Sequence, residues 1–307
     1  MKISVVIPLY NKALHIERAI ISIVNQSFQA REIIIIDDGS TDNSYQIVAT
    51  FLKKNNMIKL FSQNNQGASY TRNKGVELTE SDYVAFLDAD DEWKPDFLEN
   101  ITRLHNNFPD CGAYATSYEI ITENGEKKYP EILEVPPAPW MGIIPNLFKM
   151  MQGGSPFFTS SIVINKKVFQ LLNGFPVGVK RGEDKILWIK LGIEQPIAYY
   201  PAPCVVYHQD ASNRATKIFE REIDPILFLE QIIGSKVAPT ILIKELDNYC
   251  TLLKLQHIGN LVINGKSQSI RKMLSSIKHN KKYQKKWFLW SFLSKIQYPI
   301  LKKMRKK

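Results

Sequence analysis

The sequence predicts an α/β protein, with a mostly parallel sheet flanked by helices and a helical extension at its C-terminal end. Short runs of β-branched apolar residues alternate with segments of helical periodicity early in the chain, a pattern typical of right-handed βαβ units. Polar or acidic residues directly follow several of these runs. The length of 307 residues suits one α/β domain with an appendage, and we expect domains at residues 1–212 and 213–307.

The expected elements follow in order along the chain. Residues 3–7 are nearly all apolar, as in a strand buried on both faces. Residues 15–25 have helical spacing with one apolar stripe. That stripe consists of Ile16, Ala19, Ile20, Ile23 and Val24. We expect further strands at residues 33–36, 58–61 and 83–87, with a helix over residues 67–78.

The expected strand ends carry the residues of chemical interest. These ends read Pro8-Leu9-Tyr10-Asn11, Asp37-Asp38-Gly39-Ser40-Thr41-Asp42 and Asp88-Ala89-Asp90-Asp91. In open α/β sheets, ligands bind beyond the carboxyl ends of the strands, so we expect these stretches to share one site. Gly39 permits a tight turn, and Ser40, Thr41 or Asp42 can cap the helix that follows.

Asp88 and Asp90 place two carboxylates on one side of the backbone. Two such anions repel each other unless a cation lies between them. Mg²⁺ and Mn²⁺ take oxygen ligands and bridge carboxylates to phosphate oxygens. The sequence therefore predicts a divalent metal that holds a diphosphate. A lone carboxylate at a strand end is more often a cap or a turn former, which is the role we expect for Asp42.

Other nucleotide-binding classes do not fit the first turn. That turn has no glycine and thus lacks the dinucleotide fingerprint, and a P-loop is also absent, which argues against a dehydrogenase or an NTPase.

The three cysteines are an odd number without short spacing, which favours a reducing compartment. The start of the chain does not resemble a secretory signal, and no apolar run approaches the length of a membrane span. We therefore expect a cytoplasmic protein.

These motifs together resemble family 2 glycosyltransferases. The stretches that carry the resemblance are residues 4–11 and 37–42, Asn65-Gln66-Gly67, Arg72-Asn73-Lys74-Gly75, Asp88-Ala89-Asp90, Gly174-Phe175, Arg181-Gly182-Glu183-Asp184 and Leu187-Trp188. The resemblance covers roughly residues 1–210. It implies a GT-A fold and an inverting transfer from a nucleotide-activated sugar.

The resemblance also implies roles for single residues. Asp38 would accept a hydrogen bond from the base, which favours uracil, and Arg72 would approach the nucleotide unless it is merely a surface arginine. Asp90 would bind the metal, with Asp88 near the ribose or the metal. His208 would complete the metal site unless it is simply packed or exposed. The residues expected to bind the donor are Pro8, Tyr10, Asn11, Asp38, Asn65, Gly67, Arg72, Asp88 and Ala89.

An inverting transfer needs one base to take the proton of the acceptor hydroxyl. Asp184 matches the family's base, with Glu183 beside it. Adjacent residues on a helix do not face the same way, so we expect Asp184 alone to point at the acceptor. The alternative is an acidic pair favoured by the dipole at a helix N-terminus.

Residues 119–156 are rich in proline, which indicates irregular loops of the kind that carry specificity. Trp140, Phe157 and Phe158 either stack on a sugar or a lipid-linked acceptor, or anchor these loops. We expect a saccharide or a lipid-linked saccharide as acceptor, as in the synthesis of bacterial surface polysaccharide.

The C-terminal part is helical and basic. Helical spacing appears at residues 219–233, 239–262 and 267–277. Residues 266–307 hold 14 of the 40 Lys and Arg residues and no Asp or Glu, so the 30 acidic residues outnumber the basic ones elsewhere. Lysines beside Trp287-Phe288-Leu289-Trp290 suit a helix lying in an anionic membrane surface. We expect peripheral attachment at the inner face of the cytoplasmic membrane; a plain solvated tail is the alternative.

Two other function classes compete with the glycosyltransferase. A nucleotidyltransferase of similar fold would show a glycine-rich, basic phosphate loop after the first strand, and this chain has none. A nucleic-acid-binding protein would use the basic tail, but the acidic strand ends would then have no role. The tail's aromatic residues also have no use in that class, so we expect no nucleic-acid partner.

Overall fold

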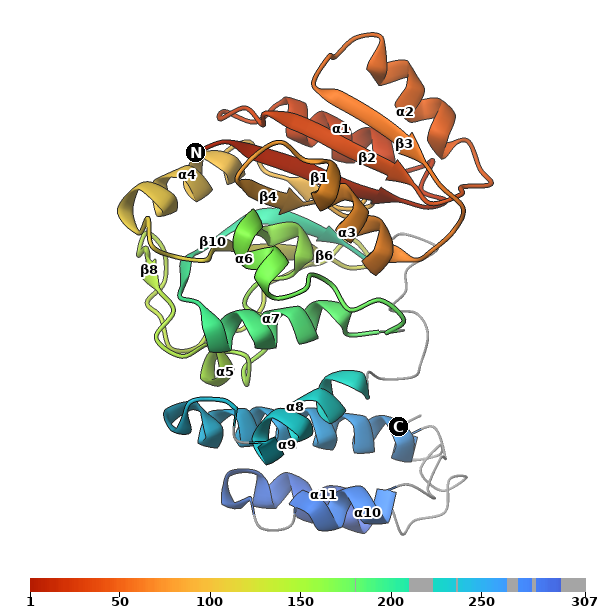
Figure 1. Cartoon of the computed structure of the whole chain (residues 1–307). Coiled ribbons are helices and arrows are strands. Elements are labelled where there is room, and N and C mark those ends of the chain that lie inside the picture. Colours follow the sequence, from red (N-terminus) through yellow and green to blue (C-terminus); the bar gives the residue numbers. More distant parts are fainter. Residues whose placement is uncertain (180, 210–222, 236, 264–269, 278–279, 294–307) are drawn as a thin grey trace. The chain divides into compact units, whose positions relative to one another are not determined.

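The computed structural model describes the chain except for residues 180, 210–222, 236, 264–269, 278–279 and 294–307 (Figure 1). The chain divides into two compact units. The first unit comprises Met1–Gly178 and Glu183–Arg214, and the second comprises Val179–Gly182 and Ala215–Lys307. The boundary that we expected between residues 212 and 213 falls outside the described residues.

The first unit is built on one ten-stranded sheet in the order β3-β2-β1-β4-β9-β6-β10-β5, with β7 beside β6 and β8 beside β10 (Figure 1). The strands are β1 Ile3–Leu9, β2 Glu32–Asp37, β3 Ile58–Ser62, β4 Tyr83–Phe86, β5 Glu92–Trp93, β6 Ala113–Ile121, β7 Lys127–Lys128, β8 Gly142–Ile143, β9 Ile162–Asn165 and β10 Ile197–His208. The helices of this unit are α1 Ile16–Val24, α2 Ser44–Leu52, α3 Ala68–Leu78, α4 Phe97–Asn107, α5 Leu147–Met150, α6 Lys166–Leu171 and α7 Glu183–Glu194, with a 3₁₀ turn at Thr159–Ser161.

The expected α/β architecture is confirmed, but the sheet is mixed rather than mostly parallel. Strands β1 to β4 are parallel to their neighbours in this group. Beyond β4, β9 runs antiparallel to both β4 and β6, while β6 and β10 are parallel. The βαβ pattern of the first part thus describes only half of the sheet. The expected strands and helices of that part lie within a few residues of the observed ones.

The turn after β2 differs in detail from our expectation. Helix α2 begins at Ser44 with Asn43 in the capping position, so none of Ser40, Thr41 and Asp42 is the cap residue. Asp42 still satisfies the start of the helix, because its Oδ1 accepts hydrogen bonds from Ser44 N at 2.9 Å and from Ser44 Oγ at 2.5 Å. Its Oδ2 accepts from Ala13 N at 3.1 Å. Asp42 is therefore a turn former, as expected, one position away from the cap.

Helices cover both faces of the first strands. The apolar stripe of α1 is buried in one core with alternate residues of β1 and β2 and with α4. On the opposite face α3 packs closely against β1, because Gly75 has no side chain. A Cβ at Gly75 would lie 2.3 Å from Cγ1 of Val6. This glycine lets α3 approach the sheet and so brings Arg72, on the same helix, close to the strand ends.

Glu32, the first residue of β2, ties three segments together. It is 3% exposed and accepts hydrogen bonds from Ser4 Oγ at 2.7 Å, Lys59 Nζ at 2.8 Å and Glu80 N at 2.7 Å. Burial alone would raise the pKa of this carboxyl, but these hydrogen bonds outweigh it and hold the pKa below its ordinary value. The carboxylate form is thus the one that the fold favours.

We expect Glu32→Gln to lower the free energy of unfolding by about 1–3 kcal/mol at neutral pH. Because the folded-state pKa is lowered, this stabilisation is present above the ordinary carboxyl range and is lost as the pH falls through the folded-state value. Urea unfolding at several pH values measures it. Glu77→Gln, at an exposed acid of α3 outside this network, is the control. If Glu32→Gln lowers the free energy of unfolding by the same amount in acid as at neutral pH, this assignment is contradicted.

The second unit is helical. Its helices are α8 Asp224–Ser235, α9 Thr240–Ile263, α10 Ile270–Ile277 and α11 Gln284–Leu293, with a 3₁₀ turn at Lys281–Tyr283. These agree with the expected helices where those are described. A separate apolar core joins α9 and α10 to the segment that carries Tyr283 and Trp287. Within the described residues, no helix has the length and hydropathy needed to cross a bilayer. The basic end of the chain, residues 294–307, lies outside the described part.

Candidate active site

The loop after β1 connects two of the acidic turns. Asn11, with a φ of +51°, donates its main-chain N–H to Ser40 Oγ at 3.0 Å and accepts from Thr41 N at 2.8 Å through its side chain. The next residue, Lys12, places its ammonium 2.6 Å from Oδ2 of Asp90. Consecutive residues therefore contact the turn after β2 and the turn after β4. The strand ends that the sequence singled out are therefore joined by direct contacts.

The first cluster of polar residues is centred on Asp38, which is 3% exposed and contacts the segment from Gln63 to Gly67. Its Oδ1 accepts from Gln63 Nε2 and Gln66 N, and its Oδ2 accepts from Gly67 N, each at 2.8 Å. Asn65 Nδ2 donates to the Asp38 carbonyl at 3.0 Å. A carboxylate offers about four acceptor positions, and three of them are used here. Asp38 thus first fixes the loop that begins α3.

Arg72, in α3, forms the second cluster. Its side chain is 7% exposed, with Nη2 2.7 Å from Asp88 Oδ1 and Nη1 3.1 Å from Glu183 Oε1. Burial acts to lower the pKa of Arg72, but the carboxylates of Asp88 and Glu183 outweigh burial and raise it. Arg72 is therefore a buried cation that joins the turn after β4 to the start of α7. It is not a surface arginine.

An aromatic layer supports this arginine. The guanidinium lies 5.2 Å from the centroid of the Phe175 ring, a cation–π geometry. Asn73, the next residue of α3, holds Phe175 in place, because its side chain donates to Phe175 O at 2.8 Å and accepts from Phe175 N at 2.9 Å. Phe175 also packs edge-on against Trp188 of α7. The motif stretches around Arg72, Phe175 and Trp188 thus form one structural unit.

Asp91 is fully buried behind the turn after β4. Its Oδ2 accepts from Ser160 Oγ at 2.6 Å, and the same Oγ accepts from Asp88 N at 3.1 Å. Burial, and then the negative charges of Asp90 and Asp88, raise the pKa of Asp91 well above its ordinary range. Ser160 therefore links the buried Asp91 carboxyl to the backbone that presents Asp88.

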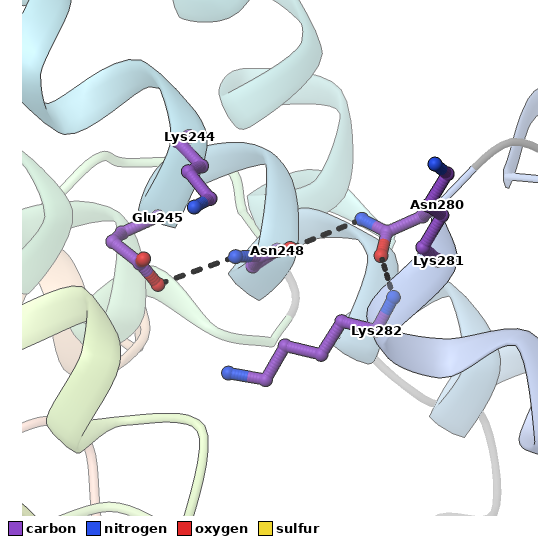
Figure 2. A pocket seen from close by; sticks show the side chains of 6 residues that line it. All are labelled: Lys244, Glu245, Asn248, Asn280, Lys281 and Lys282. Carbon is purple, nitrogen blue, oxygen red and sulfur yellow. Dashed lines mark hydrogen bonds between the residues drawn. The ribbon is translucent and has the colours of Figure 1, made fainter.

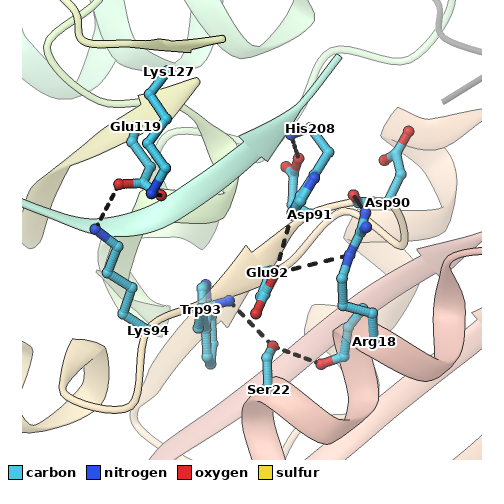
Figure 3. Close-up of polar contacts among 11 residues, drawn as sticks. Arg18, Ser22, Asp90, Asp91, Glu92, Trp93, Lys94, Glu119, Lys127 and His208 are labelled. Carbon is cyan, nitrogen blue, oxygen red and sulfur yellow. Dashed lines mark hydrogen bonds and ion pairs between the residues drawn. The ribbon is translucent and has the colours of Figure 1, made fainter. Parts of the chain in front are cut away.

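His208, at the end of β10, lies beside this turn. Its main-chain N–H is 3.4 Å from Asp91 Oδ1, and its ring Nε2 is 3.2 Å from Glu92 Oε2 (Figure 3). Arg18 donates to the Asp90 carbonyl at 2.7 Å in the same region (Figure 3). His208 is thus adjacent to the acidic turn, and its ring contacts Glu92.

The acidic pair at the start of α7 divides into two environments. Glu183 is bound to Arg72. Asp184 accepts from Lys185 N at 2.7 Å, and its charge acts on both Arg72 and Tyr118. Burial, followed by Tyr207, Asp184 and Asp91, raises the pKa of Tyr118 to about 12. Asp184 therefore lies within the electrostatic reach of the acidic turn and of Arg72.

The acidic turn offers part of the ligand set of a divalent cation and leaves other ligand positions to a substrate. Asp88 and Asp90 supply carboxylate oxygens, which are paired here with Arg72 and Lys12. Among the described residues, no three His, Cys, Asp or Glu side chains are grouped to hold a metal by themselves. Mg²⁺ commonly takes only one or two carboxylates together with substrate phosphates, so the residues present suit a cation that arrives with a diphosphate.

Several expected residues lie at the edge of these clusters. Pro8 pairs in register with Ile36 inside the sheet, and Ala89 is 2% exposed. Tyr10 is 46% exposed at the end of β1. Phe157 is buried against Trp188, which makes it a loop anchor. Within the described residues, no side-chain hydrogen bond or ion pair joins Pro8, Tyr10 or Ala89 to Asp38, Arg72 or Asp90.

The sequence reasoning missed four residues that hold the site together. Lys12 pairs with Asp90, Gln63 with Asp38, Ser160 with Asp91, and Tyr118 lies near Asp184. Lys12 stands next to the Pro8-Leu9-Tyr10-Asn11 stretch, so its position was the available signal. Ser160 lies in the 3₁₀ turn before β9 and Tyr118 lies in β6, and neither has a local sequence pattern that marks it.

Comparison with known proteins adds to this geometry. A family profile described as "Glycosyl transferase family 2" matches residues 4–170. An uncharacterized glycosyltransferase of Haemophilus influenzae is 34% identical over 142 residues, which cover 43% of this chain and 57% of that protein. The putative teichuronic acid biosynthesis glycosyltransferase TuaG of Bacillus subtilis is 36% identical over 124 residues, or 40% of this chain and 49% of TuaG. The chain thus spans about half the length of these relatives.

Solved structures share the fold. Residues 1–349 of S. aureus TarS, in complex with UDP-GlcNAc, match with a TM-score of 0.63 at 18% identity, covering 94% of this chain and 79% of that one. The mannosyltransferase PcManGT from Pyrobaculum calidifontis, in complex with GDP-Man and Mn²⁺, matches with a TM-score of 0.61 at 17% identity, covering 95% and 84%. These similarities confirm the expected GT-A fold.

Proposed function

The chain belongs to glycosyl transferase family 2, and on that premise we propose that it is an inverting enzyme that moves a sugar from a UDP-sugar to an acceptor hydroxyl. Family membership supports a transferase rather than a nucleic-acid-binding protein. The observation that carries the proposal is the convergence of the turns bearing Asp38, Asp90 and Asp184 around Lys12 and Arg72. TarS and PcManGT were solved with UDP-GlcNAc and GDP-Man, which supports a nucleotide-sugar donor here.

The donor base would bind at Asp38. Asp38 fixes the loop through its main-chain carbonyl, which accepts from Asn65, and through its carboxylate, which accepts from Gly67 N. The remaining acceptor position of the carboxylate suits the N–H of uracil. Guanine also offers N–H donors, so Asp38 alone does not exclude a GDP-sugar. We propose that the site selects uracil over guanine, and a panel of donors tests this selection.

Asp184 would take the proton of the acceptor hydroxyl as that oxygen attacks the anomeric carbon from the face opposite the diphosphate. Glu183 is engaged with Arg72, so its part is to position α7. Arg72 in turn holds Asp88 in place. The site thereby separates one carboxylate for proton transfer from those that position the donor.

A divalent ion, when bound, stabilises the charge that develops on the departing diphosphate. Asp88 and Asp90 would hold it, with His208 beside the same turn. Each of the two carboxylates is paired with a cation of the chain, Arg72 or Lys12. Lys12 would have to leave Asp90 when a metal binds there, and a diphosphate offers the released ammonium a new partner.

The acceptor is proposed to be a saccharide or a lipid-linked saccharide of a bacterial surface polysaccharide. The name of TuaG, a putative teichuronic acid biosynthesis enzyme, supports this class. Attachment at the inner face of the cytoplasmic membrane fits a lipid-linked acceptor. It is supported by the basic composition of residues 266–307 and by the exposed Phe288, Leu289 and Phe292 on α11.

A donor panel tests the proposal. The purified chain is incubated with a saccharide acceptor and with UDP-glucose, UDP-GlcNAc, UDP-galactose or GDP-mannose, with and without Mn²⁺, and release of the nucleotide diphosphate is measured. We expect turnover of at least one UDP-sugar that depends on Mn²⁺, and a product whose anomeric configuration by NMR is opposite to that of the donor. Retention of configuration, or preference for GDP-mannose, would contradict the finer assignment.

A further inference from the structure

The helical unit contains an open surface cavity with a volume of about 410 Å³. Its lining residues are Lys244, Glu245, Asn248, Asn280, Lys281 and Lys282 (Figure 2). Lys244 comes from α9, whereas Lys281 and Lys282 come from the 3₁₀ turn before α11. The cavity thus has an excess of positive charge contributed by two separate elements.

A hydrogen-bond network fixes the walls of this cavity. Asn280 Nδ2 donates to Asn248 Oδ1 at 3.2 Å and to Thr251 Oγ1 at 3.2 Å, which attaches the 3₁₀ turn to α9. Asn280 Oδ1 accepts from Lys282 N at 3.2 Å, and Asn248 Nδ2 donates to Glu245 Oε2 at 3.3 Å (Figure 2). The amides are thereby used in holding the two walls together. The ammonium groups of Lys244, Lys281 and Lys282 form the cationic part of the lining, and that of Lys282 also lies 5.8 Å from the centroid of the Tyr283 ring.

Two of these lysines have no carboxylate partner in the part of the chain that the structure describes. No ion pair there involves Lys244 or Lys281, although Lys254 nearby on α9 is paired with Glu230 at 2.8 Å. Lysine ammonium groups bind phosphate as point charges. The cavity therefore has the chemistry of a phosphate site.

The helix that follows Lys282 offers a surface suited to a bilayer. Phe288, Leu289 and Phe292 on α11 are 59%, 52% and 65% exposed, and their spacing places them on one helical face. Lysines next to exposed aromatic and aliphatic residues suit the boundary between headgroups and acyl chains. This apolar face favours a phosphate that belongs to a lipid over one that is free in solution.

We propose that the cavity bounded by Lys244, Lys281 and Lys282 binds the phosphate of an anionic lipid headgroup while the exposed face of α11 enters the bilayer surface. The inference deepens the proposed membrane association by giving it a discrete site, and it does not depend on the transfer chemistry. It accounts for a basic cavity far in sequence from any residue of the candidate active site.

Vesicle sedimentation with the full chain tests this proposal. The vesicles contain either phosphatidylcholine alone or phosphatidylcholine with phosphatidylglycerol. Lys244→Gln, Lys281→Gln and Lys282→Gln are combined in one variant. Its matched control combines Lys272→Gln, Lys285→Gln and Lys286→Gln, which remove the same charge from exposed positions of the same unit. We expect the cavity variant to lose about tenfold or more in affinity for the anionic vesicles, and the control variant to lose several-fold less.

Equal losses in the two variants would overturn the discrete site, because they would show only a diffuse basic surface. Two further arms separate the sources of the phosphate. If the cavity variant loses binding of inorganic phosphate but keeps vesicle binding, the lipid assignment is overturned. It is also overturned if the variant loses only the binding of a single-stranded oligonucleotide. UDP binding serves as the folding control in every variant. Unchanged UDP binding with lost vesicle binding supports the proposal and leaves the proposed enzyme activity untouched.

Discussion

Replacing Asp184 with Asn is expected to lower the rate of transfer by about 10²–10⁴-fold while leaving UDP affinity unchanged. The loss follows because a positioned base that removes the acceptor proton contributes about this factor. Asn keeps the acceptor oxygen that receives Lys185 N, so the start of α7 should keep its fold. Steady-state transfer rates and UDP titration by calorimetry measure the two quantities separately.

Glu194→Gln is the matched control, because Glu194 is an exposed acid at the other end of the same helix. We expect it to leave transfer unchanged. Full turnover in Asp184→Asn would show that Asp184 is not the base. Loss of turnover in Glu183→Gln with unchanged stability, together with an active Asp184→Asn, would move the role to Glu183.

Replacing Arg72 with Met is expected to destabilise the first unit by about 3 kcal/mol and to abolish donor binding. Breaking a buried ion pair on one side leaves uncompensated charge, which costs about 3–5 kcal/mol. We expect the lower value because the Asp88 and Glu183 side chains are 30% and 20% exposed. The two carboxylates that Arg72 now separates would then repel each other. Chemical denaturation measures the change.

Two further variants distinguish the charge effect from a packing effect. Arg103→Met, at an exposed arginine of α4, is expected to change the free energy of unfolding by less than about 0.5 kcal/mol. Adding Glu183→Gln to Arg72→Met should recover part of the lost stability, since one of the two repelling charges is removed. An Arg72→Met variant as stable as the wild type would refute the bridging role of this arginine.

Local patterns in the sequence predicted the first half of the fold well. The β-branched runs and the apolar stripe of residues 16–24 are local signals, and β1, β2 and α1 appear where these signals place them. Strand β6, Ala113–Ile121, was not expected. It combines small, polar and aromatic residues that are nearly all buried, so neither alternation nor a continuous apolar run marks it. The antiparallel pairing of β9 likewise depends on contacts distant in the chain.

The candidate site divides in the same way. Acidic turns such as Asp88-Ala89-Asp90 are visible in the sequence because they follow apolar strands. Their neutralising partners are not, since Lys12 and Arg72 reach their carboxylates across 78 and 16 residues. Ser160 is 69 residues from Asp91, and its role depends on the 3₁₀ turn that precedes β9. Charge compensation inside the site is thus a property of the fold.

The central claim is that the acidic turn and a divalent ion together hold a nucleotide diphosphate. Calorimetric titration of UDP into the wild type and Asp90→Asn, with and without Mn²⁺, tests it most directly, with Asp110→Asn as a control at an exposed acid. We expect Mn²⁺ to strengthen UDP binding about tenfold or more in the wild type and in Asp110→Asn, and to have little effect in Asp90→Asn. Equal strengthening by Mn²⁺ in Asp90→Asn, or no UDP binding by the wild type, would contradict the claim.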